Sequence, residues 1–289
     1  MSKRFHRMLM AGCAAAVPAL GILIAVPSTA GASTAAGTPN PPGARAAALA
    51  REAIRHLSIG QHATDQGAGQ APRGVTGPTN VSSNNWSGYA DTGSRVSKVS
   101  ARWKEPAGRC GTDVISMAAF WVGIDGLKSS SVEQDGTLIE CYLGTEYAYT
   151  WWEMYPTNSV QTVGSAVRSG DSITASVTRS GSRYALKVAD ATHPANSFST
   201  TRTGSGDANS SAEWIAEAPS GPAAEYPLTD FGTWRVSNAA VTEGPRSGTV
   251  SSFRDDKITM TDVLGTTEAA PGPLGSGGSA FSVAWRSSL

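Results

Sequence analysis

Histidine is scarce in this chain of 289 residues, and of its four histidines only His193 lies beyond residue 80. A Ser-His-Asp or Cys-His system would need His193 as its base, and no Gly-x-Ser-x-Gly elbow accompanies it. A histidine-based zinc site needs more ligands than one histidine and two cysteines supply. We therefore interpret His193 as a surface turn residue and predict neither a metal site nor a cofactor.

Phosphate-binding motifs and basic clusters are also missing. The chain holds neither a Gly-x-x-x-x-Gly-Lys-Ser/Thr loop nor a Gly-x-Gly-x-x-Gly fingerprint. From about residue 81 to the C-terminus, 16 Lys and Arg stand against 21 Asp and Glu, a net charge of −5. This balance argues against nucleic acid as a partner.

The N-terminus has the features of an export signal. A basic start precedes an apolar run over residues 8–26, which is interrupted by Pro18 and followed by Pro27 and small residues up to position 32. These prolines and the small-residue site favour a cleaved signal peptide, residues 1–32, over a membrane anchor. We expect a secreted, extracellular protein with no membrane association after signal removal.

Cysteine is rare as well. Removal of the leader removes Cys13 and leaves Cys110 and Cys141. In an exported chain such a pair predicts a disulfide that contributes about 2–4 kcal/mol, and the alternative is two free buried thiols.

Residues 33–80 form an expected propeptide and linker. Residues 44–57 have the chain's one convincing helical pattern, between stretches rich in Pro, Gly and polar residues. A helix tethered ahead of an exported domain indicates a propeptide that aids folding or masks the site. The alternative is a leader remnant without a role.

Residues 81–289 lack long helical patterns and consist of short alternating or apolar runs between turn residues. This predicts one all-β domain, an antiparallel sandwich or barrel, with a hairpin at residues 179–182. The clearest expected strands are 98–103, 114–124, 147–154, 172–178, 183–189, 198–202, 212–217, 233–236, 257–263 and 280–285.

The stretch 210–219 is the most informative of these strands. Alternation places Glu213 and Glu217 on one face with Ile215, where a partly desolvated Glu213 could serve as a general acid or base. The alternative is two glutamates on a solvated outer face.

Three further segments combine amides, carboxylates and aromatic side chains. The first contains Ser83-Asn84-Asn85-Trp86. The second runs from Phe120-Trp121-Val122-Gly123-Ile124-Asp125-Gly126 to Glu133-Gln134-Asp135-Gly136. The third contains Trp151-Trp152-Glu153-Met154. Each alone is unspecific, because Trp is usually a core residue and Asp-Gly usually marks a turn. The ordered set with 210–219 resembles the glutamic peptidases, the eqolisin or G1 family, from about Asn84 to Val241.

The resemblance implies a secreted endopeptidase active at acid pH and folded as two packed antiparallel sheets (concanavalin- or jelly-roll-like). It implies Gln134 and Glu213 as the catalytic pair. Glu213 would activate water and later protonate the leaving nitrogen, while Gln134 would stabilise the oxyanion. Residues expected to bind the polypeptide substrate are Trp86, Trp121, Asp125, Trp152 and Glu153. Alternation makes either Trp151 or Trp152 a core residue, and the sequence leaves the choice open.

Two other functions fit the composition. One is a carbohydrate-active sandwich, either a glycosidase with Glu153 and Glu213 as paired carboxylates or a lectin-like domain. The other is a non-catalytic secreted binding domain. Gln134 discriminates, because only a peptidase of this kind requires it. We expect a monomer.

Overall fold

The computed structural model describes residues 52–54, 57–60 and 78–289, apart from 113–114, 223 and 289. The expected signal peptide and most of the expected 44–57 helix lie outside these residues. Residues 52–54 are helical, and the N–H of Leu57 closes this turn by donating to the carbonyl of Ile54 at 3.1 Å. Within the described residues no helix is both long and apolar enough to cross a bilayer.

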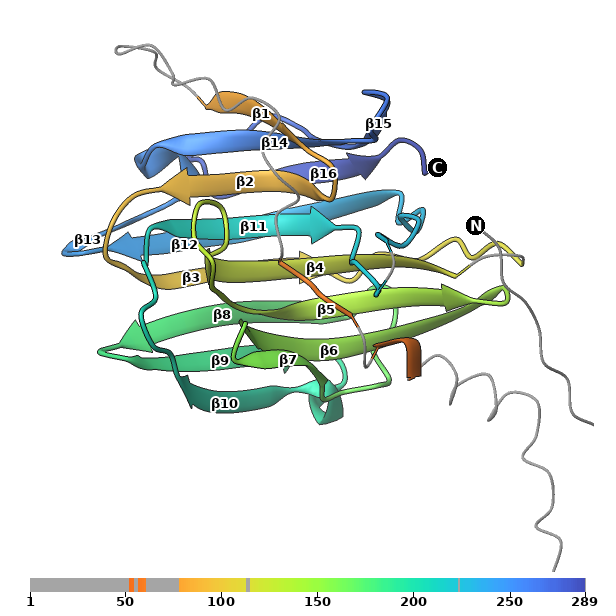
Figure 1. The fold of residues 1–289 in the computed structure, drawn as a ribbon, viewed down its shortest axis with the longest axis horizontal. Coiled ribbons are helices and arrows are strands. Elements are labelled where there is room, and N and C mark those ends of the chain that lie inside the picture. Colours follow the sequence, from red (N-terminus) through yellow and green to blue (C-terminus); the bar gives the residue numbers. More distant parts are fainter. Residues whose placement is uncertain (1–51, 55–56, 61–77, 113–114, 223, 289) are drawn as a thin grey trace, which may run out of the picture. The chain divides into compact units, whose positions relative to one another are not determined.

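The strands of the described region form a continuous hydrogen-bonded series that folds back at the β14–β15 hairpin into two layers (Figure 1). The front layer has the order β14 (Asp255–Thr261), β2 (Trp86–Thr92), β11 (Ser211–Glu217), β4 (Ser116–Asp125), β5 (Val132–Tyr142), β6 (Thr145–Tyr155) and β7 (Asn158–Thr162). The back layer has the order β10 (Phe198–Thr203), β9 (Arg183–Asp190), β8 (Ser172–Ser180), β3 (Val96–Lys104), β12 (Thr233–Glu243), β16 (Phe281–Trp285) and β15 (Thr267–Pro271).

Two short strands lie off this path. β1 (Thr79–Ser83) pairs in parallel with β14, and β13 (Arg246–Gly248) pairs with β12. Two 3₁₀ turns, Pro194–Asn196 and Val250–Ser252, lie in connections. The pairings along the main path are antiparallel, so the predicted all-β sandwich is confirmed. The expected hairpin is also confirmed, because Ser180 pairs with Arg183 across Gly181, whose φ of +62° suits a tight turn.

The main core lies between the two layers. Alternate residues of the front strands, such as Phe120 and Trp214, meet the inner face of the back layer. Trp234 of β12 packs among aromatic rings there, with its ring centroid 5.6 Å from that of Trp103 and 5.5 Å from that of Phe120. Cys110 and Cys141 form the predicted disulfide at the edge of this core, with their Cα atoms 5.1 Å apart.

The expected strands all overlap observed ones, but β1, β2, β5, β7, β13 and β15 have no counterpart among them. β5 is the longest of these. Asp135 and Gly136, which suggest a turn, lie in the middle of β5. A Cβ on Gly136 would approach the carbonyl oxygen of Phe120 to 2.0 Å, so glycine permits close strand contact there. The carboxylate of Asp135 accepts a hydrogen bond from the backbone N–H of Lys187 in the opposite layer. The dipeptide therefore serves sheet packing.

Candidate active site

The outer face of the front layer carries a second apolar cluster, which we call the cleft cluster. Strand alternation turns toward it the residues that do not face the core between the layers. The strands β4, β5 and β11 are consequently buried on both faces. Among the members of the cleft cluster are Trp86, Met117, Trp121, Leu138, Tyr149, Trp151, Val160, Ile215 and Ile258.

Gln134 stands at the centre of this face. On β5 it pairs with Gly123 of β4 on one side and with Glu153 of β6 on the other. Its Nε2 donates to Oε2 of Glu153 and to the carbonyl oxygen of Ile59, both at 2.8 Å. Gly123 leaves room beside it, because a Cβ there would lie 3.3 Å from the Cβ of Gln134 and 2.8 Å from the Trp121 ring. The side-chain amide is therefore buried, oriented and aimed at a peptide carbonyl.

Glu217, at the end of β11, binds the backbone N–H of Gly60, the residue after Ile59. Both of its carboxylate oxygens lie 2.9 Å from the N–H of Gly60, and Oε2 also accepts a hydrogen bond from Nε1 of Trp121 at 2.8 Å. Burial raises the pKa of Glu217 well above its usual value, and the hydrogen bonds from Gly60 and Trp121 oppose that rise. Gln134 and Glu217 thus hold the two ends of one peptide group, the Ile59-Gly60 peptide.

Glu213 lies on the same face but has no such contact. It pairs with Gly123 on β4, so only that glycine separates it from Gln134 in the sheet register. Its two oxygens are buried and have no hydrogen-bond partner among the described residues. Burial raises its pKa well above the usual value, the neighbouring Ser211 side chain opposes that rise, and the nearby charges of Asp125, Glu133 and Asp91 add to it.

The residues expected to bind substrate divide between the cleft and other positions. Trp86 and Trp121 lie in the cleft cluster with their rings edge to face at 5.0 Å. Glu153 is there too, with a pKa raised to about 8 by burial, although its bond from Gln134 lowers it. Asp125 instead closes a loop, because its carboxylate accepts the backbone N–H groups of Asn209 and Ser210 at 2.7 and 2.8 Å.

Trp152 requires a correction. Its ring lies in the core between the layers, with the guanidinium of Arg202 4.4 Å from the ring centroid, while Trp151 belongs to the cleft cluster. Adjacent residues of a strand point to opposite faces, so Trp151 is the member of this pair that lines the cleft.

Two groups near Gln134, the Glu217 carboxylate and the Ile59-Gly60 peptide, were not predicted from the sequence as functional candidates. Glu217 carried a usable signal, because the alternation that places Glu213 on the cleft face places Glu217 there as well. The Ile59-Gly60 peptide carried none, since it lies more than 70 residues before Gln134 in a stretch without periodicity.

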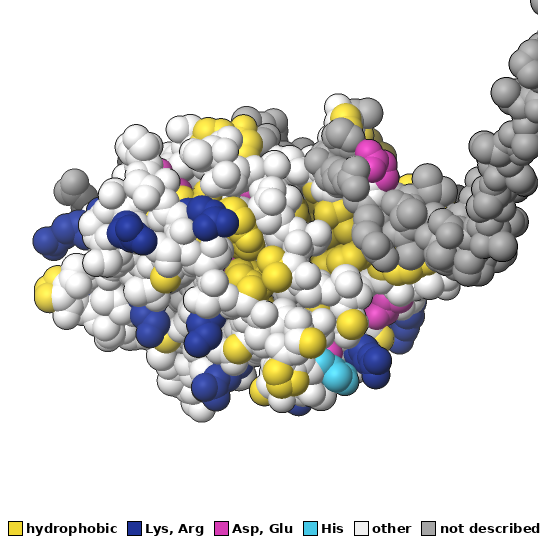
Figure 2. Space-filling model, turned by 90° about the horizontal axis from the view of Figure 1, so that it is seen from below, with side chains coloured by type: hydrophobic (Ala, Val, Ile, Leu, Met, Phe, Trp, Pro, Cys, Tyr) yellow, Lys and Arg dark blue, Asp and Glu magenta, His cyan; other side chains and the backbone are white. Residues whose placement is uncertain are grey.

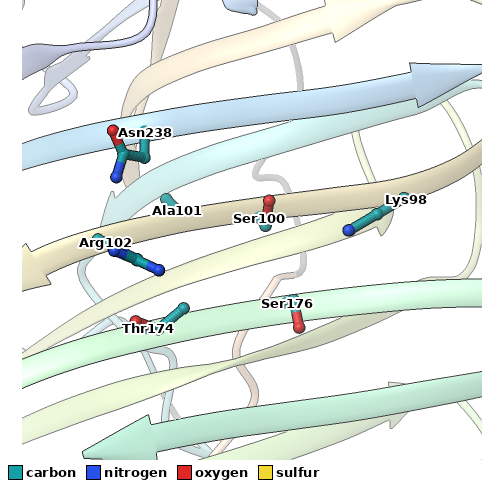
Figure 3. Close-up of a pocket in the computed structure, with 7 residues that line it drawn as sticks. All are labelled: Lys98, Ser100, Ala101, Arg102, Thr174, Ser176 and Asn238. Atoms are coloured by element: carbon teal, nitrogen blue, oxygen red, sulfur yellow. The ribbon is translucent and has the colours of Figure 1, made fainter. Parts of the chain in front are cut away.

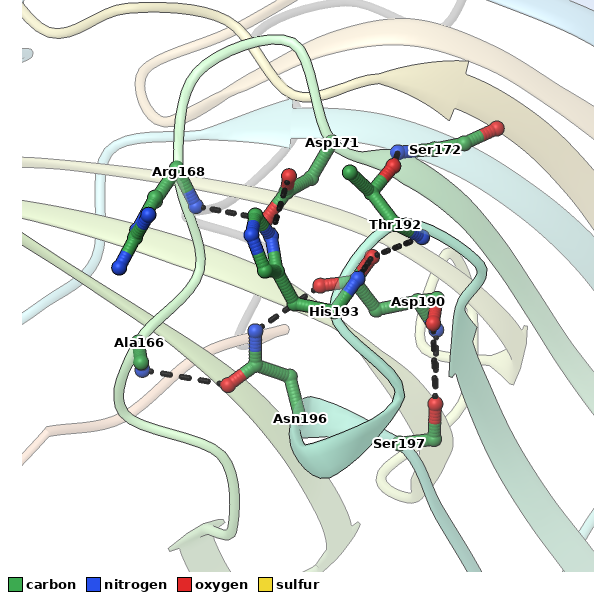
Figure 4. Close-up of polar contacts among 9 residues, drawn as sticks. All are labelled: Ala166, Arg168, Asp171, Ser172, Asp190, Thr192, His193, Asn196 and Ser197. Atoms are coloured by element: carbon green, nitrogen blue, oxygen red, sulfur yellow. Dashed lines mark hydrogen bonds and ion pairs between the residues drawn. The ribbon is translucent and has the colours of Figure 1, made fainter.

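His193 lies in a turn after β9, and its side chain pairs with Asp171 and not with Gln134 or Glu217. Its Nδ1 lies 2.8 Å from Oδ1 of Asp171, and its backbone N–H donates to Asp190 (Figure 4). Asp171, Asp190 and His193 are the one group in the described residues that could hold a metal ion. Asp190 also accepts the side-chain amide of Asn196 and the N–H of Thr192, so these contacts order the turn.

A polar pocket of about 280 Å³ lies elsewhere, over β3, β8 and β12 of the back layer (Figure 3). Lys98, Arg102 and Asn238 line it with smaller residues, and Gln134 is not among its lining residues. It is therefore separate from the cleft.

The chain is similar to a known protein family and to individual proteins. The Peptidase A4 family model matches residues 84–270. Aspergillopepsin-2 from Aspergillus niger is 25% identical over 216 residues, which cover 65% of this chain and 77% of that protein.

Solved structures share the fold. A structure of scytalido-glutamic peptidase with a transition state analog inhibitor is similar with a TM-score of 0.60 at 21% identity, covering 70% of this chain and 98% of that one. SCP-B, a member of the Eqolisin family in a complex with the tripeptide Ala-Ile-His, has a TM-score of 0.56 with the same identity and coverage. Since the family model spans more than half of its length, the chain belongs to the Peptidase A4 family, the glutamic peptidases, and is a peptidase that acts on polypeptides.

Proposed function

We propose that this peptidase is a secreted endopeptidase that acts in acid, with Gln134 and Glu217 as its catalytic pair. The observation that carries the proposal is the Ile59-Gly60 peptide group. Its carbonyl oxygen accepts from Gln134 Nε2 at 2.8 Å, and its N–H donates to Glu217 at 2.9 Å. These are the two polar ends of a peptide bond that hydrolysis must activate.

The reaction follows from this arrangement. In a site opened to water the burial that raises the pKa of Glu217 is relieved, so Glu217 can be ionised. It then removes a proton from a water molecule, whose oxygen attacks the carbonyl carbon of the substrate. The Gln134 amide donates to the carbonyl oxygen as it becomes an oxyanion. The C–N bond then breaks as Glu217 returns the proton to the leaving nitrogen. Glu153 holds the Gln134 amide in place from the other side.

Glu213 is the competing base, because the family resemblance points to it and it shares a cleft face with Gln134. Its position differs, because no hydrogen bond ties it to a peptide group within the described residues. Three acidic side chains, Asp125, Glu133 and Asp91, also add to the rise in its pKa, whereas Glu153 alone does so for Glu217. Glu217, in contrast, has donors aimed at it from Trp121 and Gly60. We therefore place Glu217 first.

The distribution of acidic residues supports action in acid. Many carboxyl groups are buried, and burial raises the pKa of Glu133 to about 9 and that of Glu105 and Glu140 to about 8. Such groups are neutral in acid, where burying them costs little. On the face shown in Figure 2, Lys and Arg side chains are frequent and Asp and Glu side chains are few.

The test is release of peptides from an unfolded protein substrate between pH 2 and pH 8, with pepstatin present. Gln134→Ala and Glu217→Gln each lower kcat about 100-fold or more, while Glu213→Gln leaves activity within a few-fold of wild type. Exposed Gln161→Ala and Glu225→Gln serve as matched controls. Loss with Glu213→Gln but not with Glu217→Gln would return the role of base to Glu213. Full activity in Gln134→Ala would refute the pair altogether.

A further inference from the structure

The outer face of the back layer gathers positive charge. Strand alternation turns every second residue of β3, β8, β9 and β12 away from the core between the layers. The exposed cations that these strands place outward define what we call the basic face: Lys98, Arg102, Lys104, Arg183, Lys187 and Arg235. The chain from about residue 81 onward has a net charge of −5, so this concentration of positive charge is local.

The chain itself does not neutralise the basic face. The four strands hold two acidic residues, Asp190 and Glu243, each at the end of its strand. Asp190 is buried, while Glu243 pairs with the buried Val96 and its carboxylate lies against Gly93. Among the described residues, no ion pair includes any of the six cations. Their charges are therefore free to meet an anion from solution.

The pocket of about 280 Å³ lies within this face. Lys98 and Arg102 are four residues apart on β3, which is about 13 Å along a strand. Figure 3 shows their side chains pointing toward each other, with Ser100 between them. Thr174 and Ser176 of β8 also line the pocket and add hydroxyl groups. Two cations with hydroxyl groups between them provide the donors that an oxyanion and its neighbouring hydroxyls require.

Lys187 and Asn238 add to this set from the strands on either side. Lys187 pairs with Ser176, which pairs with Ser100, so Lys187 lies two strands, about 10 Å, from β3. On β12 a register shift accompanies Asn238, whose φ is +52°, and such a bulge re-aims a side chain. Here it places on the pocket an amide that both donates and accepts hydrogen bonds.

The basic face lacks the groups that two other kinds of anionic partner need. In the part of the chain that the structure describes, the exposed large hydrophobic residues are Leu143, Val163, Val263 and Leu264, and none lies on the four strands. Sites for single-stranded nucleic acid typically stack bases on aromatic side chains, and membrane-surface sites insert apolar ones. Cations separated by hydroxyl and amide groups instead suit a polymer whose negative charges are separated by sugar hydroxyls.

We propose that the basic face binds a linear polysaccharide that carries sulfate esters, with one sulfate held between Lys98 and Arg102. Lys104 at one end of the face and Arg183 at the other extend the contact to further sulfate groups. Lysine, arginine and sulfate esters all stay charged from acid to neutral pH, so binding persists over that range. The cleft lies on the outer face of the other layer, so a polymer bound here does not cover it.

The experiment measures binding of the full chain to dextran sulfate by calorimetry at pH 4 and pH 7, with uncharged dextran as the reference polymer. Lys98→Gln/Arg102→Gln removes both charges at the pocket and keeps long polar side chains. The matched control is Lys128→Gln/Arg254→Gln, because these exposed cations lie outside the four strands and the change in charge is the same. Asn238→Gly removes the amide and permits the same backbone conformation. Urea unfolding midpoints report whether each variant is folded.

We expect wild type and the control to bind dextran sulfate with similar affinity at both pH values and not to bind dextran. Lys98→Gln/Arg102→Gln weakens binding about tenfold or more, and Asn238→Gly weakens it about threefold. Lys98→Arg/Arg102→Lys keeps both charges and binds within about threefold of wild type. If Lys98→Gln/Arg102→Gln binds as tightly as the control, the proposal is overturned. Tighter binding of polyphosphate or double-stranded DNA than of dextran sulfate overturns the assignment to a polysaccharide.

Discussion

Asp91 provides a quantitative test of how buried carboxyl groups set the stability of this fold. It lies on β2 directly opposite Asp255 of β14, is fully buried, and has no hydrogen-bond partner for either oxygen among the described residues. Burial raises the pKa of Asp91 to about 9, and the charges of Asp255, Glu243 and Asp256 add to that rise. The folded protein therefore holds a proton on Asp91 at neutral pH.

The sign of the pH effect follows from linkage. Where the native state binds more protons than the unfolded state, the free energy of unfolding falls as pH rises. This stabilisation is complete below the pKa of about 3.9 of an unfolded aspartate and is lost as pH rises toward 9. A pH of 7 is about 3 units above the pKa of this aspartate in the unfolded state. At about 1.4 kcal/mol per unit, the loss is about 4 kcal/mol.

The Asp91→Asn variant removes this titration and keeps the shape of the side chain. The amide has its own burial cost, but that cost is the same at every pH. Urea unfolding followed by tryptophan fluorescence at pH 4 and pH 7 measures the free energy of unfolding for both proteins. Between pH 4 and pH 7 we expect the free energy of unfolding of the variant to fall by about 4 kcal/mol less than that of wild type.

A matched control is Glu225→Gln, because Glu225 is exposed. Its pH dependence is expected to match that of wild type. If Asp91→Asn and wild type lose the same free energy of unfolding between pH 4 and pH 7, Asp91 is not protonated in the folded protein at neutral pH, and the reasoning is refuted.

Further predictions concern the disulfide, the cleft and maturation. Replacing Cys110 and Cys141, 31 residues apart, by Ser lowers the free energy of unfolding by about 3–4 kcal/mol in urea titrations, and an unchanged midpoint would contradict this. Trp152→Ala and Trp151→Ala each lower that free energy by about 3–5 kcal/mol because both side chains are buried, but only Trp151→Ala also raises KM in peptide hydrolysis. A raised KM for Trp152→Ala alone would contradict their placement. Mass spectrometry of the active secreted protein is expected to give an N-terminus between about Gln61 and Val81, and a fully active protein that starts directly after the leader would oppose this.

Much of the fold could be predicted because strand alternation and turn chemistry are local. The pattern of β11 put Glu213, Ile215 and Glu217 on one face, and the structure has Ile215 in the cleft cluster with Trp214 in the core. The hairpin at 179–182 and the disulfide were likewise readable from residue type and context. β5 was missed because the dipeptide Asp135-Gly136, taken alone, is typical of a turn. In the folded protein it lies in a strand, where Gly136 permits close contact with the neighbouring strand.

The sequence by itself determined the all-β class, the family, Gln134 as a candidate and the shared face of the two β11 glutamates. These depend on short periodicities and on motifs of adjacent residues. Only the tertiary structure decided that Trp151 rather than Trp152 lines the cleft, and that Glu217 meets the same peptide group as Gln134. Periodicity tells which residues share a face, but which face is covered, and by what, depends on contacts between distant segments. The burial of Ile59 and Gly60 against β5 and β11 is such a contact.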